Sequence, residues 1–323
     1  MPRRSCVLKV SSCVPLSVFF KDFAIMLDKI AQRNGLFDPA VCGGFVLLHG
    51  GAGVQDPRGP AHAAASKVIE GIALRGASAL AGGASGLNVV KQCLFELESE
   101  PCFNAGLGSA LQSDGQARLT AAVMSGPGQI FSGVMGLEGA IHPSTLALML
   151  QGKTTRVVCP PGTAELARRA GLKSESPVTP ERLARWEQAK KENHPHDFDT
   201  VGCVVVTANG ELFAGTSTGG RGFEAPGRVS DAATVAGTYA SGFAAISATG
   251  IGEEIVDDGL ALRIESRVRD GMALESATAK CFSEARERKR SYGWIAASST
   301  GAWNFSWTTE AETGVIPCRL LRS

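Results

Sequence analysis

The chain has 323 residues, of which 44% are hydrophobic, so it can bury a large apolar core, and this excludes intrinsic disorder for most of its length. Its 32 Lys and Arg residues nearly balance its 31 Asp and Glu residues, which excludes the basic surface typical of nucleic-acid-binding proteins. The nine cysteines are odd in number and none are spaced Cys-X-X-Cys, which argues against a zinc ribbon or a redox dithiol. Unpatterned cysteines are typical of a reducing compartment, so we expect a cytoplasmic protein.

The segment before residue 44 contains one apolar run, Cys13 to Phe20, which follows Arg3 and Arg4. This run is too short to span a bilayer, and no small-residue cleavage site follows it. We therefore expect residues 1–43 to form a loose N-terminal extension. A targeting segment and a translation start at Met26 are the alternatives for this part of the chain.

The first half of the chain predicts strands and helices in alternation. Gly44 to His49 is a continuous apolar run typical of a buried strand, and it ends in the run Gly50-Gly-Ala-Gly53. The elements expected next are helices at 61–80 and 87–97, strands at 117–124 and 130–137, and helices at 145–150 and 163–170.

The second half begins with a polar segment, residues 173–199, which we expect to be a surface linker that is mobile and partly helical. Two strand-like runs, 200–207 and 211–218, then flank Asn209-Gly210, which predicts a β-hairpin. The first run is apolar on both faces, so its sheet should be covered on both sides. The remaining elements expected are strands at 244–248, 293–298 and 302–308 and helices at 253–268 and 272–287. Helices outside and antiparallel strands inside indicate a layered α+β fold.

The length of the hairpin loop decides which side chains lie opposite one another. A three-residue loop, Ala208 to Gly210 with Gly210 in the left-handed region, places Thr200 directly opposite Thr218. Their Cβ atoms would then be about 5 Å apart. A two-residue loop would instead place Val201 opposite Thr218. The sequence leaves both registers open.

Two other kinds of catalytic or metal site have weaker support. Ser217 lies in the pattern Gly-X-Ser-X-Gly of serine hydrolases, but no helix pattern follows it and all five histidines precede it, whereas the triad order requires a later histidine. His194, His196 and Asp197 are clustered potential metal ligands, but they lie in a proline-containing linker without an obvious distant partner. We interpret that cluster as structural or solvated.

Thr200 begins a buried strand directly after the polar linker. A threonine hydroxyl is a poor nucleophile without a base, and an α-amino group, with a pKa of about 7.7–8.0, can act as one. Cleavage between Asp199 and Thr200 would create that amino group on the nucleophile itself.

Seven motifs in order carry a resemblance to a known family from about residue 44 to residue 309. They are His49-Gly-Gly-Ala-Gly53, Phe103-Asn-Ala-Gly-Leu-Gly-Ser109, Asp199-Thr-Val-Gly202, Thr216-Ser-Thr-Gly-Gly220, Pro226-Gly-Arg-Val-Ser-Asp231, Ala236-Gly-Thr-Tyr239 and Ala248-Thr-Gly-Ile-Gly-Glu253. With them the chain resembles the N-terminal-nucleophile hydrolases of the plant-type asparaginase and isoaspartyl peptidase group.

The resemblance implies a four-layer αββα sandwich and a precursor that cleaves itself between Asp199 and Thr200. Residues 44–199 would become an alpha chain and residues 200–323 a beta chain of one structural domain. It also implies these site roles: Thr200 as nucleophile and base, Thr218 as its polarising partner, Thr249 and Gly250 at the oxyanion, Arg228 on the substrate α-carboxylate, Asp231 on the α-ammonium, and Gly252 in the same loop. The donor types suit this chemistry, because a planar carboxylate matches the arginine fork and an oxyanion needs fixed donors.

The resemblance further implies hydrolysis of isoaspartyl dipeptides and L-asparagine to L-aspartate by a homodimer of cleaved protomers, with no nucleic-acid or membrane partner. No cofactor would be required, although a sodium ion could bind the backbone carbonyls of Leu97, Glu98, Glu100, Phe103, Ala105 and Leu107. Thr120 and Ser125 stand where the family usually has aspartate. The loss of these two carboxylates leaves an uncleaved, catalytically silent scaffold as one alternative. A glycosylasparaginase-like amidase is the alternative within the same fold.

Overall fold

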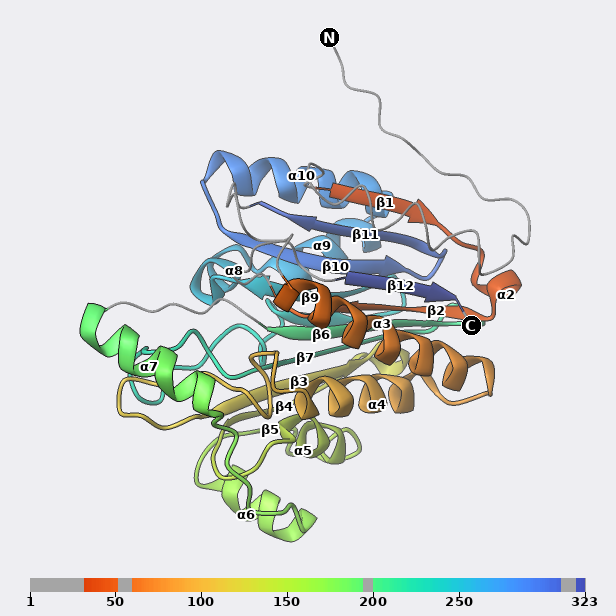
Figure 1. Ribbon diagram of the computed structural model, residues 1–323. Coiled ribbons are helices and arrows are strands. Elements are labelled where there is room, and N and C mark those ends of the chain that lie inside the picture. The colour runs from red at the N-terminus through yellow and green to blue at the C-terminus, as the bar shows by residue number, and fades with distance from the viewer. Residues whose placement is uncertain (1–31, 52–59, 194–199, 309–317, 323) are drawn as a thin grey trace.

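The computed structural model describes residues 32–51, 60–193, 200–308 and the backbone of residues 318–322. Its strands form two sheets (Figure 1). The larger sheet has the order β12 (Cys318–Arg322), β2 (Gly44–His49), β6 (Val201–Thr207), β7 (Leu212–Thr218), β3 (Leu119–Ser125), β4 (Ile130–Leu137) and β5 (Val157–Val158). The smaller sheet has the order β1 (Gln32–Leu36), β11 (Ala302–Trp307), β10 (Tyr292–Ser298), β9 (Ala244–Gly250) and β8 (Thr238–Ala240). All pairs are antiparallel except β4 with β5.

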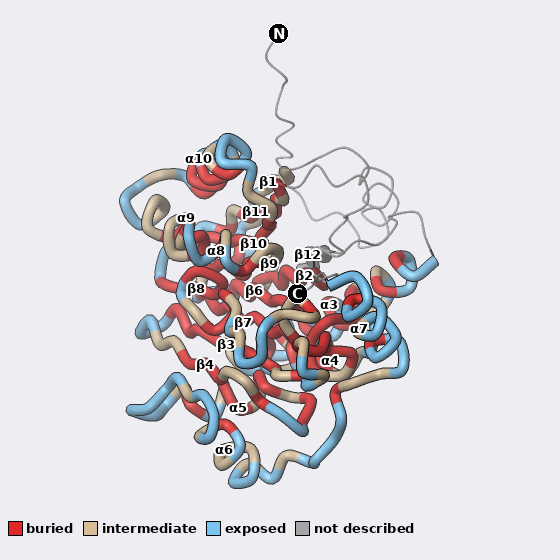
Figure 2. Tube along the Cα trace, turned by 90° about the vertical axis from the view of Figure 1, so that its left-hand side faces the viewer, coloured by how far each residue is buried: buried red, intermediate tan, exposed pale blue. Residues whose placement is uncertain are grey.

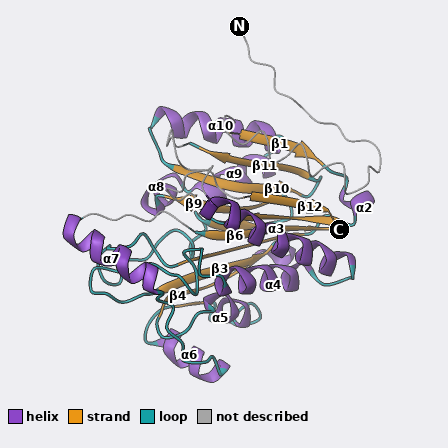
Figure 3. Cartoon of the chain, viewed as in Figure 1, coloured by secondary structure: helices purple, strands orange, loops and turns teal. Residues whose placement is uncertain are grey.

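Helices contact both sheets, and the sheets contact each other through β6 and β7 on one side and β9 and β10 on the other. The helices against the larger sheet are α3 (Pro60–Ala81), α4 (Gly86–Ser99) and α5 (Pro143–Met149), and those against the smaller sheet are α9 (Leu260–Arg269) and α10 (Leu274–Glu287) (Figure 3). The remaining helices are α2 (Pro39–Cys42), α6 (Gly162–Ala170), α7 (Pro180–Glu192), α8 (Gly252–Asp258) and the short 3₁₀ turn η1 (Pro127–Gln129). This mixture of helix and sheet confirms the α+β class.

Strand β6 lies at the centre of the molecule because both of its faces are apolar. Val204 and Val206 pack into the cluster between the two sheets, whereas Cys203 and Val205 pack into the cluster formed with α3 and α4. Strands β2, β3, β6, β7, β9 and β10 are accordingly almost fully buried, while the helices expose their outer sides (Figure 2). The expectation that this sheet is covered on both faces is confirmed.

Several elements differ from their expected form. Residues 32–43 are not a loose extension, because β1 pairs with β11 and Asp38 caps α2 through a hydrogen bond from the Ala40 amide. Residues 1–31 lie outside the described residues. The single helix expected at 253–268 is two helices, because Gly259 adopts a φ of +55° between α8 and α9. Strands β1, β5, β8 and β12 were not expected, since they are short and have no apolar alternation.

Within the described ranges, none of the helices combines the length and apolar character needed to cross a bilayer.

Candidate active site

The hairpin brings the hydroxyl groups of Thr200 and Thr218 together. Val201 pairs with Ser217 and Gly210 has a φ of +75°, so the three-residue loop is the correct alternative of the two that the sequence left open. Thr200 Oγ1 donates a hydrogen bond to Thr218 Oγ1 at 3.1 Å, and the Gly220 amide donates to the same oxygen at 3.1 Å. Both threonines are almost fully buried. Thr218 is therefore positioned to accept from and orient the Thr200 hydroxyl.

A third threonine lies beside this pair. Thr120 on β3 is the direct partner of Thr218 on β7, and residues opposite one another in antiparallel strands point to the same face. A bulge in the pairing of β3 with β4 falls at this residue. The sequence predicted no role for Thr120 beyond the loss of a carboxylate. Its proximity to Thr218 depends on the pairing of strands that lie far apart in the chain.

Thr249 and Gly250 end strand β9 of the opposite sheet. Ser247, two residues earlier, reaches across the interface to Thr216 Oγ1 at 2.7 Å. Because side chains alternate along a strand, Thr249 points to the same side as Ser247, toward the sheet that carries Thr200. Among the described residues, the Thr249 hydroxyl is one of the buried polar groups without a hydrogen-bond partner. It is available to a group that enters the site.

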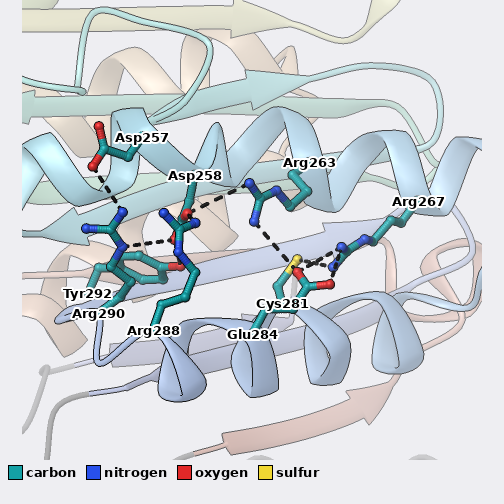
Figure 4. A network of polar contacts seen from close by, with 9 residues as sticks. All are labelled: Asp257, Asp258, Arg263, Arg267, Cys281, Glu284, Arg288, Arg290 and Tyr292. Atoms are coloured by element: carbon teal, nitrogen blue, oxygen red, sulfur yellow. Dashed lines mark hydrogen bonds and ion pairs between the residues drawn. The ribbon is translucent and has the colours of Figure 1, made fainter.

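Gly250 is held against the neighbouring strand. It pairs with Tyr292 and has a φ of +131°, and a Cβ atom there would lie 2.5 Å from Tyr292 Cα, so no other residue fits. The Tyr292 hydroxyl donates to Asp258 at 2.6 Å. Asp258 is in turn paired with Arg288 within the network of arginines and carboxylates shown in Figure 4. This network fixes the strand that backs the proposed oxyanion donors.

Arg228, Asp231 and Gly252 converge, as the resemblance implied for a substrate clamp. A Cβ atom on Gly252 would lie 2.8 Å from Asp231 Oδ1 and 2.9 Å from Arg228 Nη2, so glycine is needed for the two charged groups to approach this loop. Arg228 pairs with Glu253 through two hydrogen bonds of 2.8 Å, while its buried Nη1 has no partner among the described residues. A carboxylate and a guanidinium thus lie side by side, as the α-ammonium and α-carboxylate of an amino acid require.

Asp231 is a buried carboxylate with one free oxygen. Burial raises its pKa to about 6, although the hydrogen bond from Ser230 Oγ, at 2.6 Å, and the nearby Arg228 charge act in the opposite direction. Its Oδ2 atom has no partner within the described part of the chain. A substrate ammonium would supply both the missing donor and the missing positive charge.

His49 and Ser217 do not form a catalytic pair. Burial lowers the pKa of His49 to about 3, although a hydrogen bond with the Thr200 backbone acts in the opposite direction. The ring is therefore neutral, and its Nε2 contacts Ser247 Oγ at 2.9 Å. Ser217 points to the other face of β7 from Thr218 and donates to Glu98 at 2.7 Å. The geometry of a serine hydrolase is absent from these described residues.

The loop of carbonyl groups expected to bind sodium is partly used by the chain itself. The carbonyls of Leu97, Glu98 and Glu100 accept hydrogen bonds from the amides of Glu100, Leu107 and Phe103. A carbonyl oxygen has two lone pairs, so each retains one for a cation, and the donor set fits an ion that prefers oxygen. No cluster of His, Cys, Asp and Glu that could hold a metal occurs among the described residues. His194, His196, Asp197 and Asp199 lie outside the described residues, so neither the histidine cluster nor the bond expected to be cleaved is described.

The chain is similar to known proteins over most of its length. The model of the asparaginase family matches residues 43–316. The chain belongs to the asparaginase family. It is 40% identical to the isoaspartyl peptidase/L-asparaginase of Nostoc sp. over 272 residues, which cover 79% of this chain and 83% of that relative.

The chain is also similar to relatives from other organisms. The chain is 39% identical over 275 residues to the isoaspartyl peptidase/L-asparaginase of Synechocystis sp., covering 80% of this chain and 83% of the relative. It is 34% identical over 264 residues to the plant-type L-asparaginase of Thermococcus kodakarensis, covering 74% and 84%. The resemblance drawn from the seven motifs is confirmed. The site predicted from the sequence did not include Ser230 and Glu253. Their positions next to Asp231 and Gly252 in the chain were the signal that could have identified them.

Proposed function

We propose that this protein is a self-cleaving amidohydrolase with an N-terminal threonine nucleophile, which converts isoaspartyl dipeptides and L-asparagine to L-aspartate. The observation that carries the proposal is the buried hydrogen bond from Thr200 to Thr218, on the side of the sheet toward the Thr249 hydroxyl, which has no partner in the described part of the chain. The convergence of Arg228 and Asp231 supports an amino-acid head group as substrate. Asparagine and a β-aspartyl peptide share that head and differ only in the leaving amine, so one pocket serves both.

In the proposed reaction, hydrolysis of the bond between Asp199 and Thr200 first frees the Thr200 α-amine. This amine takes the proton of the Thr200 hydroxyl while the hydroxyl oxygen attacks the substrate amide carbon. The Thr249 hydroxyl and the Gly250 amide donate to the resulting oxyanion. The proton then passes to the leaving amine, and water hydrolyses the remaining ester to L-aspartate.

The proposal also includes the layers of the fold, the cellular location, a bound ion and the oligomeric state. The contacts of helices with each sheet and of the sheets with each other support a four-layer αββα sandwich. The thiols of Cys93, Cys159, Cys203 and Cys281, which form no disulfide within the described part of the chain, support a cytoplasmic location. A sodium ion on the carbonyl loop and a homodimer of cleaved protomers complete the proposal.

A denaturing gel of the purified protein tests the proposal, together with assays of L-asparagine, a β-aspartyl dipeptide and a β-aspartyl-linked amino sugar. We expect two fragments, the smaller of which begins Thr-Val-Gly-Cys, and release of L-aspartate from the first two substrates. An intact chain that hydrolyses asparagine would refute the assignment of Thr200 as the N-terminal nucleophile. An intact and inactive chain would favour the silent scaffold, and a preference for the amino sugar would favour the glycosylasparaginase-like alternative.

A further inference from the structure

The side-chain amide of Gln112 binds the backbone of the turn that carries Arg228. Gln112 Oε1 accepts a hydrogen bond from the Gly227 amide at 2.7 Å, and Gln112 Nε2 donates to the Arg228 carbonyl at 3.2 Å. One carboxamide therefore satisfies both backbone groups that flank the Gly227–Arg228 peptide unit. Gln112 is 1% exposed, so water does not replace these contacts.

The turn itself depends on this support because of its conformation. Its closing hydrogen bond runs from the Arg228 amide to the Ala225 carbonyl at 3.0 Å, with Pro226 second and Gly227 third at a φ of +80°. Proline and glycine in this order are typical of a type II turn. Among the residues that the structure describes, the Arg228 guanidinium is held at its far end by the half-exposed carboxylate of Glu253. Gln112 thus fixes the backbone end of the same side chain.

Gln112 is itself held by further hydrogen bonds, one of which joins its side chain to the Glu224 carboxylate. Arg118 Nη1 donates to Gln112 Oε1 at 2.7 Å, and the Gln112 amide donates to the Gln116 carbonyl at 2.9 Å. Trp186 Nε1 on α7 donates to the Gln112 carbonyl at 2.8 Å. Because α7 precedes Thr200 in the chain and Arg228 follows it, Gln112 joins the segments on either side of the proposed cleavage.

We propose that Gln112 is a positioning residue for substrate binding, which acts through Arg228 and sets the affinity for the α-carboxylate. This inference rests on the proposed function of Arg228. A two-pronged contact between guanidinium and carboxylate depends on the placement of the guanidinium plane, which the backbone of the turn determines. Gln112 touches neither the nucleophile pair nor Thr249, so its loss should affect binding of the head group rather than bond cleavage.

The test compares Gln112→Ala with Gln151→Ala. Gln151 is a matched control, because its carboxamide also donates to backbone carbonyls, those of Val123 and Ile130, but it is not in contact with the Arg228 turn. We expect Gln112→Ala to raise KM for L-asparagine about tenfold or more with kcat changed less than about threefold, and to leave self-cleavage intact. Arg228→Lys should show the same pattern. Gln151→Ala should lower the melting temperature without changing KM.

Two further measurements keep the inference testable. If Gln112→Ala does not fold, Gln112→Glu retains the acceptor for the Gly227 amide but loses the donor to Arg228, and its KM should still rise. If the native protein does not hydrolyse asparagine, calorimetric titration with L-aspartate replaces the assay. Weaker binding of L-aspartate to Gln112→Ala than to Gln151→Ala would then support the role of Gln112 in binding, independently of the proposed hydrolysis. An unchanged KM, equal effects of the two variants, or no binding of L-aspartate by the native protein would overturn it.

Discussion

The Thr200 hydroxyl is oriented by Thr218, because it donates to Thr218 Oγ1 and that oxygen also accepts from the Gly220 amide. We therefore expect Thr200→Ala to abolish both self-cleavage and turnover, and Thr200→Ser to cleave slowly. Thr218→Ala should lower kcat between about 10-fold and 1,000-fold, the loss expected when one supporting group leaves such a site. Fragment analysis and steady-state kinetics measure these effects. Full turnover by Thr200→Ala would contradict the assignment.

The buried Asp231 carboxylate should lower the free energy of unfolding at neutral pH, because burial raises its pKa from 3.8 to about 6. The folded state holds the Asp231 proton more tightly than the unfolded state does. Protonated Asp231 therefore makes its full favourable contribution to the free energy of unfolding below about pH 4, and this contribution is lost as the pH rises through about 6. Asp231→Asn should therefore raise the free energy of unfolding at pH 8, by on the order of 3 kcal/mol, with no gain at pH 3.5.

The same Asp231→Asn variant should lose activity, because a neutral amide does not attract the substrate ammonium. Urea unfolding at both pH values measures stability, and both proteins should carry Thr200→Ala so that neither is cleaved. A variant that is less stable than its parent at pH 8 would show that the Asp231 carboxylate is stabilised by contacts stronger than those described.

At the scale of elements, Gly259 separates α8 from α9 because its φ of +55° is unfavourable for a residue with a side chain. No atom lies within 4 Å of a Cβ placed there, so Gly259→Ala tests conformation alone. We expect a loss of about 1–2 kcal/mol in the free energy of unfolding. Gly152→Ala is the control, since its site is equally open and its φ lies outside that region, and it should be nearly neutral.

At the scale of the whole molecule, the proposed cleavage would leave the two fragments interleaved. β6 and β7 would belong to the C-terminal fragment, yet they lie between β2 and β3 of the N-terminal fragment. β1 of the N-terminal fragment likewise pairs with β11 of the other. We therefore expect the fragments to elute together in size-exclusion chromatography and to separate only in denaturant. Separate elution without denaturant would contradict this arrangement.

Local patterns in the sequence were sufficient for the hairpin, most of the helices and the central strands. Continuous apolar runs, turn residues and helical spacing act over a few residues, so they can be read from the chain directly. They also limited the Thr200 hairpin to two registers. The fold class and the family follow from the same local information, because the motifs are short and occur in order.

Only the tertiary structure decided which distant groups meet. The contacts of Thr218 with Thr120 and of Gln112 with Arg228 join residues whose separation in the chain carries no local signal. Short edge strands such as β1 were missed for the same reason, since they gain their stability from pairing rather than from an apolar repeat. The hairpin register was decided by Gly210, whose positive φ fits the three-residue loop and so sets Thr200 opposite Thr218.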